Sequence, residues 1–214
     1  MLVFSCSSDY KEIEDKLRKE LNSKEVLIWD GHNEILKEDY YLIEVNDRKR
    51  DREYPERPND ASLLAFAFYK EFIIEKYNQL KPVKVSFISD LNSFGDGKDY
   101  YYSTHSLTKF LEATKVTERL LKNINDEQGF VSMNDLDNNH LNGSDLDSIF
   151  SPLFNNSHKI NAFVYKGFYE AQIEKDDANF SLIMLIELSN RETKKVYKIE
   201  FSQRSGKIIG INGC

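Results

Sequence analysis

The spacing of apolar residues along this chain predicts an α+β protein, in which helices pack on mostly antiparallel strands. Stretches with an apolar residue at every third or fourth position indicate helices, and stretches with one at every second position indicate strands. Aromatic residues are plentiful, with 12 tyrosines and 14 phenylalanines, whereas the chain has only 9 glycines and 4 prolines. This composition is typical of strand-rich cores with few long loops.

The first half of the chain is predicted to form a small α+β layer. Ser8 or Asp9 can cap its first helix, Asp60 can cap its second, and Pro82 ends the second. The predicted elements are a helix over 9–22, a strand over 25–30, a turn over 30–33, a strand over 40–45, a helix over 60–80 and strands over 83–89 and from 100. The run 47–57 interleaves five basic and four acidic side chains, which is typical of a solvated loop.

The second half is predicted to form helices followed by a long antiparallel meander. Its elements are a helix over 106–123, a polar stretch over 124–143, a short helix capped by Ser144, and strands over 159–173, 180–188, 195–201 and 207–211. Residues 190–193 and 203–206 are expected to form hairpin connections. In the first of these strands Tyr165 and Tyr169 fall in the same phase, so we expect both on one face. The chain therefore divides into residues 1–8, an α+β domain over 9–104 and a second domain over 105–214.

The second half resembles the NTF2-like cone fold, in which helices pack on a curved antiparallel sheet. The likeness is carried by the strands 159–173, 180–188 and 195–211, the last of which contains Ser205-Gly206-Lys207-Ile208-Ile209. It covers about half of the chain. The whole arrangement resembles cell-envelope lipoproteins of the Bacteroidetes type.

The N-terminal residues Leu2-Val3-Phe4-Ser5-Cys6 resemble the end of a bacterial lipoprotein signal peptide, where an apolar run stops at a small residue and a cysteine. The resemblance implies that Cys6 is lipidated and anchors the chain to a membrane of the cell envelope, facing the periplasm or the cell surface. The alternative is an apolar tail in which Cys6 is a free thiol, in a cytoplasmic protein.

Composition and charge bound the classes of partner. The chain has 214 residues, 40% hydrophobic and 30% charged, which indicates a globular fold. Its net charge of −7 argues against nucleic acid as a partner, because such proteins usually present a basic face. Cys6 and Cys214 are its only cysteines, which is too few for a disulfide framework or a thiolate metal site.

No motif for a metal or a cofactor is present in the sequence, and we expect neither. Asp135-Leu136-Asp137-Asn138-Asn139-His140 resembles the opening of a calcium loop, but the sixth position lacks glycine and the twelfth lacks glutamate. The chain has four scattered histidines, with no pair at the i, i+4 spacing of a helical metal site. Phosphate-binding loops, dinucleotide fingerprints and nucleophile elbows are also missing.

The candidate catalytic residues are two glutamates on predicted strands. The resemblance to NTF2-like cones implies that the cone can host an enzyme that moves a proton with Asp, His and Tyr side chains, and a catalytic carboxylate there needs apolar surroundings that tune its pKa. Glu170 follows Phe168 and Tyr169, and Glu187 lies between Ile186 and Leu188. The competing interpretation places both on the solvent face of a sheet.

These observations favour a membrane-tethered envelope protein with a binding or scaffolding role and no catalysis, whose ligand, a protein or a small molecule, is left open. Two alternatives belong to other classes. One is an enzyme of the isomerase or dehydratase type that uses the pocket of the cone. The other is a soluble acidic inhibitor or immunity-type protein, steered to a basic target by charge.

Overall fold

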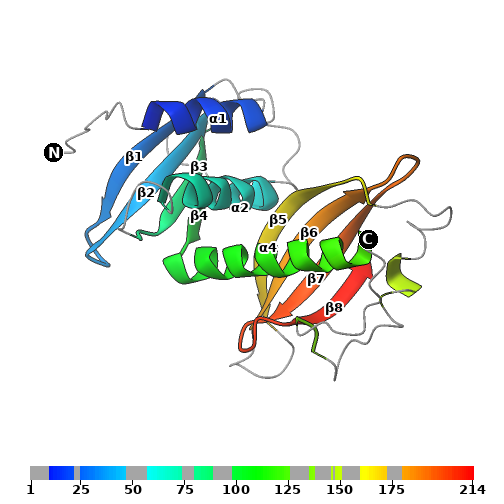
Figure 1. The fold of residues 1–214 in the computed structure, drawn as a ribbon. Coiled ribbons are helices and arrows are strands. Elements are labelled where there is room, and N and C mark those ends of the chain that lie inside the picture. The colour runs from blue at the N-terminus through cyan, green and yellow to red at the C-terminus, as the bar shows by residue number, and fades with distance from the viewer. Residues whose placement is uncertain are drawn as a thin grey trace. The chain divides into compact units, whose positions relative to one another are not determined.

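The computed structural model describes residues 10–21, 25–46, 57–73, 80–88, 98–125, 135–137, 146, 148–150, 160–172 and 180–214. These residues form an α+β protein with two four-stranded sheets, which confirms the predicted class (Figure 1). The chain splits into two compact units, Met1–Thr108 and Lys109–Cys214, and the division falls within helix α4 (Thr104–Asn125). The boundary expected from the sequence lay after residue 104.

The sheet of the first unit has the order β1-β2-β3-β4. Its strands are β1 (Glu25–Asn33), β2 (Glu38–Asn46), β3 (Val83–Ile88) and β4 (Lys98–Tyr102). β1 and β2 form an antiparallel hairpin, whereas β2 and β3 run parallel. Parallel neighbours need a long crossover, and the segment between them contains α2 (Arg57–Phe68) and the π-helical turn η3 (Tyr69–Ile73).

Helices α1 (Lys11–Leu21) and α2 cover one face of this sheet (Figure 1). The ring of Tyr41 on β2 contacts Tyr10, which precedes α1, with centroids 6.3 Å apart, and Phe68 on α2 at 5.1 Å. Alternate strand residues are buried beneath the helices: Val26, Ile28, Tyr41, Ile43, Val45, Val83, Val85 and Phe87. The period of two predicted for β3 is therefore confirmed.

The turn predicted over 30–33 is wrong, because these residues extend β1 and the turn occupies 34–37. Tertiary contacts override the turn-forming tendency of this sequence. Tyr10 donates a hydrogen bond to Asp30, and Gly31 lies under Tyr40, where a Cβ atom would come within 2.5 Å of the ring. An aromatic ring on the neighbouring strand can support a glycine in a strand in this way.

The second helix also begins earlier than predicted, at Arg57. Asp60 therefore lies in its first turn and does not cap it, and Pro58 is tolerated near the start because the first N–H groups of a helix have no partner within it. Ser8, Asp9, Ser144 and residues 47–56 of the mixed-charge run lie outside the described residues.

The second unit contains an antiparallel meander with the order β5-β6-β7-β8. Its strands are β5 (Ala162–Gln172), β6 (Phe180–Ser189), β7 (Lys194–Ser202) and β8 (Ile208–Gly213). Helix α4 packs on one face of it (Figure 1): Phe110 stacks on Phe168 with centroids 4.9 Å apart, and Thr117 donates a hydrogen bond to the sulfur of Met184 at 3.4 Å. Ser103 precedes α4 and accepts the N–H of Ser106 at 3.1 Å, so the helix begins before the predicted residue 106.

A bulge in β5 changes the face on which its later residues lie. The register shifts between Tyr165 and Gly167, so Tyr165 pairs with Ile186 whereas Tyr169 pairs with Ile183. Ile186 and Ile183 are three positions apart on β6, so their side chains point to opposite faces of the sheet. Residues that pair across two strands share a face, so Tyr165 and Tyr169 also lie on opposite faces. The prediction that Tyr165 and Tyr169 share a face is therefore wrong.

The side chain of Asn125 joins the end of α4 to the chain just before β5. Its Nδ2 donates to the carbonyl of Ile160 at 3.0 Å, and its Oδ1 accepts the N–H of Ile160 at 3.0 Å. One amide side chain thus makes both hydrogen bonds that a neighbouring strand residue would make. It fixes where the meander starts relative to the helix that covers it.

We predict that Asn125→Ala lowers the free energy of unfolding by about 1–3 kcal/mol, because two hydrogen bonds of about 0.5–1.5 kcal/mol each are lost. Urea unfolding followed by circular dichroism measures this change, and hydrogen exchange at the Ile160 amide reports the local effect. Asn161→Ala is the matched control, because that side chain is exposed. Unchanged exchange at Ile160 in Asn125→Ala would contradict the prediction.

Glu44 carries a partly buried carboxylate on the face of the first sheet that α1 and α2 leave uncovered. It pairs with Leu27 on β1 and Ser86 on β3. Burial, and secondly the nearby charge of Glu25, raises the pKa of Glu44 above its ordinary value. The folded chain therefore holds this proton more tightly than the unfolded chain does. The resulting stability is complete below the unfolded pKa and is lost as the pH rises through the folded pKa.

We predict that Glu44→Gln raises the unfolding temperature at pH 7 and that the gain disappears below about pH 4, where the native glutamate is itself protonated. Fluorescence of Trp29, the only tryptophan, follows unfolding of the first unit. Glu34→Gln, at an exposed position of the turn, serves as the control. An equal gain for Glu44→Gln at both pH values would show that the carboxylate charge is not the cause.

Candidate functional site

The β1–β2 turn, residues 34–37, is held by a side chain at the end of β1. Asn33 Oδ1 accepts the backbone N–H of Ile35 at 3.0 Å and that of Leu36 at 3.1 Å. Lys37 closes the turn with a φ of 51°, in the left-handed region. Both backbone donors at the tip of the turn are therefore satisfied within the protein.

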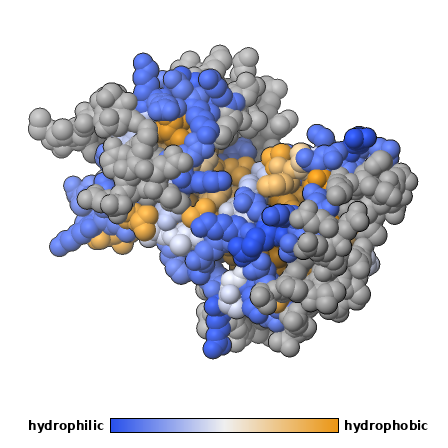
Figure 2. Space-filling model, in the orientation of Figure 1, coloured by the Kyte–Doolittle hydropathy of each residue, from blue (hydrophilic) through white to orange (hydrophobic). Residues whose placement is uncertain are grey.

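Ile35 and Leu36 are the most exposed large apolar side chains among the described residues. Their exposed fractions are 92% for Ile35 and 62% for Leu36. Hydrophobic surface is visible at the end of the β1–β2 hairpin in Figure 2. We call these two side chains, with the turn that Asn33 holds, the aliphatic tip.

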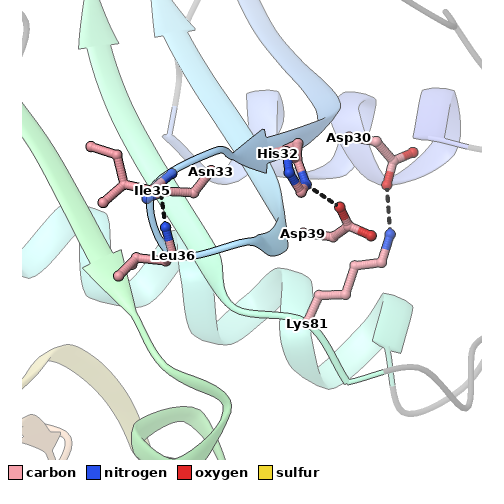
Figure 3. A network of polar contacts seen from close by, with 7 residues as sticks. All are labelled: Asp30, His32, Asn33, Ile35, Leu36, Asp39 and Lys81. Carbon is pink, nitrogen blue, oxygen red and sulfur yellow. Dashed lines mark hydrogen bonds and ion pairs between the residues drawn. The ribbon is translucent and has the colours of Figure 1, made fainter.

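Charged residues lie on the other side of the hairpin from the aliphatic tip, as Figure 3 shows. His32 Nδ1 lies 2.8 Å from Asp39 Oδ1, and Lys81 Nζ lies 3.2 Å from Asp30 Oδ1. Asp30 also accepts a hydrogen bond from the Tyr10 hydroxyl at 2.9 Å. The hydrogen bond from His32, together with the charge of Lys81, lowers the pKa of Asp39.

The polar contacts of the hairpin fix its orientation relative to the rest of the sheet. Lys81 precedes β3, and Tyr10 precedes α1, so both join the hairpin to other elements of the first unit. On the uncovered face, the Tyr101 hydroxyl donates a hydrogen bond to Glu38. Partial burial and this hydrogen bond raise the pKa of Tyr101 to about 12. These contacts hold the parts of the two strands that lie next to the tip.

The two glutamates predicted as catalytic candidates lie on opposite faces of the second sheet. Glu170 pairs with Leu182 and is exposed. Glu187 has its carboxylate 3.3 Å from Lys166 Nζ and 4.0 Å from Lys194 Nζ. The structure therefore does not bring them together.

Cys6, the predicted lipidation site, lies outside the described residues, as do His140 and His158. His32 bonds to Asp39, His105 lies exposed in α4, and Cys214 is an exposed free thiol. Within the described ranges, no group of three or more His, Cys, Asp or Glu side chains is arranged to hold a metal ion. No helix in the described part of the chain is long and apolar enough to cross a membrane.

The chain was compared with protein-family models, with curated proteins and with solved structures, and none of the three comparisons found a match. Any functional conclusion therefore depends on the chemistry of the chain itself. The aliphatic tip offers apolar contact, through Ile35 and Leu36, on a backbone that Asn33 fixes. Its chemistry is that of a contact site.

Sequence reasoning missed the aliphatic tip. The available signal was the apolar pair Ile35-Leu36, set between Asn33-Glu34 and Lys37-Glu38-Asp39. An asparagine two residues before the pair is a known turn former. Because residues 30–33 are turn formers by type, the sequence pattern predicts the turn before the apolar pair and not around it.

We predict that Asn33→Ala speeds hydrogen exchange at the Ile35 and Leu36 amides by about two- to tenfold, the range expected for one lost hydrogen bond. NMR exchange measurements report each amide separately. Asn190→Ala is the matched control, because Asn190 Oδ1 accepts the N–H groups of Glu192 and Thr193 at 2.9 and 2.6 Å in the β6–β7 turn. If Asn33→Ala left both tip amides unchanged, Asn33 would not be what holds the turn.

Proposed function

We propose that this chain is a membrane-tethered binding protein of the cell envelope that acts without catalysis. The resemblance of Leu2-Val3-Phe4-Ser5-Cys6 to the end of a lipoprotein signal supports the tether, with Cys6 as the acylated residue. Bacterial lipoproteins carry several acyl chains, and such an anchor is stable where one chain alone binds only marginally. The tethered chain then faces the periplasm or the cell surface.

The observation that carries the binding role is the aliphatic tip. A large apolar side chain that is 92% exposed gains nothing from the fold, and this one stands on a turn whose backbone is fixed by Asn33. A fixed, exposed apolar element loses little conformational entropy when it contacts another surface. The tip is thus suited to binding.

The surroundings of Glu170 and Glu187 support a role without catalysis. A general acid or base needs a pKa shifted by burial or by a like charge. Glu170 is exposed to water and Glu187 lies beside two lysines, so neither has such surroundings. The helix-covered antiparallel meander of the second unit supports the likeness to NTF2-like domains, which stays a prediction.

We predict that a fatty-acid probe labels this protein in bacterial cells and that Cys6→Ser abolishes the label, because the thiol of Cys6 accepts the first acyl group. In-gel detection of the probe measures the label, and cell fractionation measures the accompanying loss from the membrane fraction. Cys214→Ser is the matched control, since it removes the other cysteine and leaves the proposed site intact.

Equal labelling of the parent and of Cys6→Ser would contradict the tether. In that case strongly salt-dependent binding to a basic protein would favour the soluble inhibitor instead, because screening weakens contacts between exposed charges.

A further inference from the structure

The aliphatic tip has a structure that suits it to an apolar environment, and its position at the end of a hairpin lets it reach one. We propose that the tip, with Ile35 and Leu36 foremost, inserts into the surface of a zwitterionic lipid bilayer. This inference rests on the proposed function, since the tether at Cys6 would keep the chain beside a membrane. It adds a second contact, made by the folded first unit.

The first argument concerns the backbone of the turn. Moving a peptide group out of water is costly unless it keeps a hydrogen bond. The N–H groups of Ile35 and Leu36 already donate to Asn33 Oδ1, so neither depends on water. The tip can therefore leave water without losing these two hydrogen bonds.

The second argument comes from another turn of the same chain that is built in the same way. Asn190 Oδ1 accepts the N–H groups of the second and third residues after it, as Asn33 Oδ1 does. That turn carries Arg191, Glu192 and Thr193, which are exposed and polar. The turn geometry therefore does not require aliphatic side chains at these positions.

The third argument distinguishes a bilayer from a protein partner. A stable protein interface buries about 800 Å² on each side and centres on aromatic or arginine anchors. The apolar part of this tip consists of two aliphatic side chains, bounded in sequence by Glu34 and Lys37, which are exposed. A bilayer accepts a small projecting apolar group without a matching pocket, and the flanking charges can stay at the level of the headgroups.

The fourth argument concerns the charge of the lipid. Three acidic residues, Glu34, Glu38 and Asp39, lie in or beside the turn against one basic residue, Lys37, and the whole chain has a net charge of −7. An anionic surface would repel both the tip and the chain, because basic residues are what such surfaces attract. The charges therefore favour zwitterionic headgroups.

The test uses the full chain carrying Cys6→Ser, so that binding through the tip is measured without acyl chains. We expect this protein to float with vesicles of phosphatidylcholine and phosphatidylethanolamine. Ile35→Ser combined with Leu36→Ser should weaken binding at least about tenfold, because the apolar transfer of both side chains is lost. Ile88→Ser is the matched control, since Ile88 is an exposed aliphatic residue at the opposite end of the same sheet.

A second measurement places the tip in the bilayer directly. A polarity-sensitive dye is attached through Leu36→Cys in the chain that also carries Cys6→Ser and Cys214→Ser. Its emission should shift to the blue when the same vesicles are added. The dye attached through Glu192→Cys, in the polar turn, should show no shift.

Three results would overturn the proposal: no flotation of the Cys6→Ser chain, flotation unchanged by the two tip substitutions, or flotation that requires anionic lipid. If the chain bound native membranes but did not bind vesicles of pure lipid, the partner of the tip would be a membrane protein and not the bilayer. Failure here leaves the acylation result at Cys6 unaffected, because that label is measured separately in cells. Circular dichroism confirms that each variant is folded.

Discussion

Backbone N–H and C=O groups at the ends and edges of a sheet have no partner in its ladder, and a folded chain has to satisfy them by other means. In this protein, side-chain oxygens accept hydrogen bonds from some of these backbone N–H groups. Glu14 on α1 accepts the N–H of Ile28 at 2.8 Å, on the edge strand β1, so the helix that covers the sheet also satisfies part of its edge. The side chain of Asn125, at the end of α4, likewise satisfies the backbone N–H and C=O groups of Ile160. These contacts tie helices to strands, and the placement of the buried faces depends on them.

The edge of β8 that faces away from β7 also gains hydrogen bonds from a segment outside the sheet. Residues 135–137 run parallel to it, with the Ile208 N–H donating to the Asp135 carbonyl at 2.8 Å and the Asp137 N–H donating to the Ile208 carbonyl at 2.9 Å. Arg119 on α4 holds this segment through two hydrogen bonds of 2.8 Å to the Asp135 carboxylate. In the sequence, Asp135 opens a polar stretch that only partly resembles a calcium loop. Its carboxylate is instead engaged by a guanidinium, whose bidentate geometry matches it.

Local patterns predicted the order of the helices and strands well, because period-two and helical spacing report which side of an element is buried. The failures have long-range causes. The bulge between Tyr165 and Gly167 is specified by pairing with β6 and has no local signature, so Tyr169 was placed on the wrong face. Asp30 and Gly31 are turn formers by type, yet Tyr10 and Tyr40 hold them in β1. The aliphatic tip escapes prediction for the same reason, because it lies in the turn over 34–37 and not in the predicted turn over 30–33.

The proposed tether would supply attachment to the membrane, whereas the proposed bilayer contact would orient the first unit. Burying Ile35 and Leu36 would contribute about 1.5–3 kcal/mol for each side chain before the costs of association, which gives a weak and reversible contact with the membrane. In a chain that is acylated at Cys6, the tip would act at a high effective concentration at the membrane, so a weak contact would be occupied for much of the time. Because Asp30 and Asp39 bond to Lys81 and His32 on the other side of the hairpin, only one side is apolar. Contact through the tip would therefore set which way the first unit faces the lipid, which the acyl chains at Cys6 alone do not do.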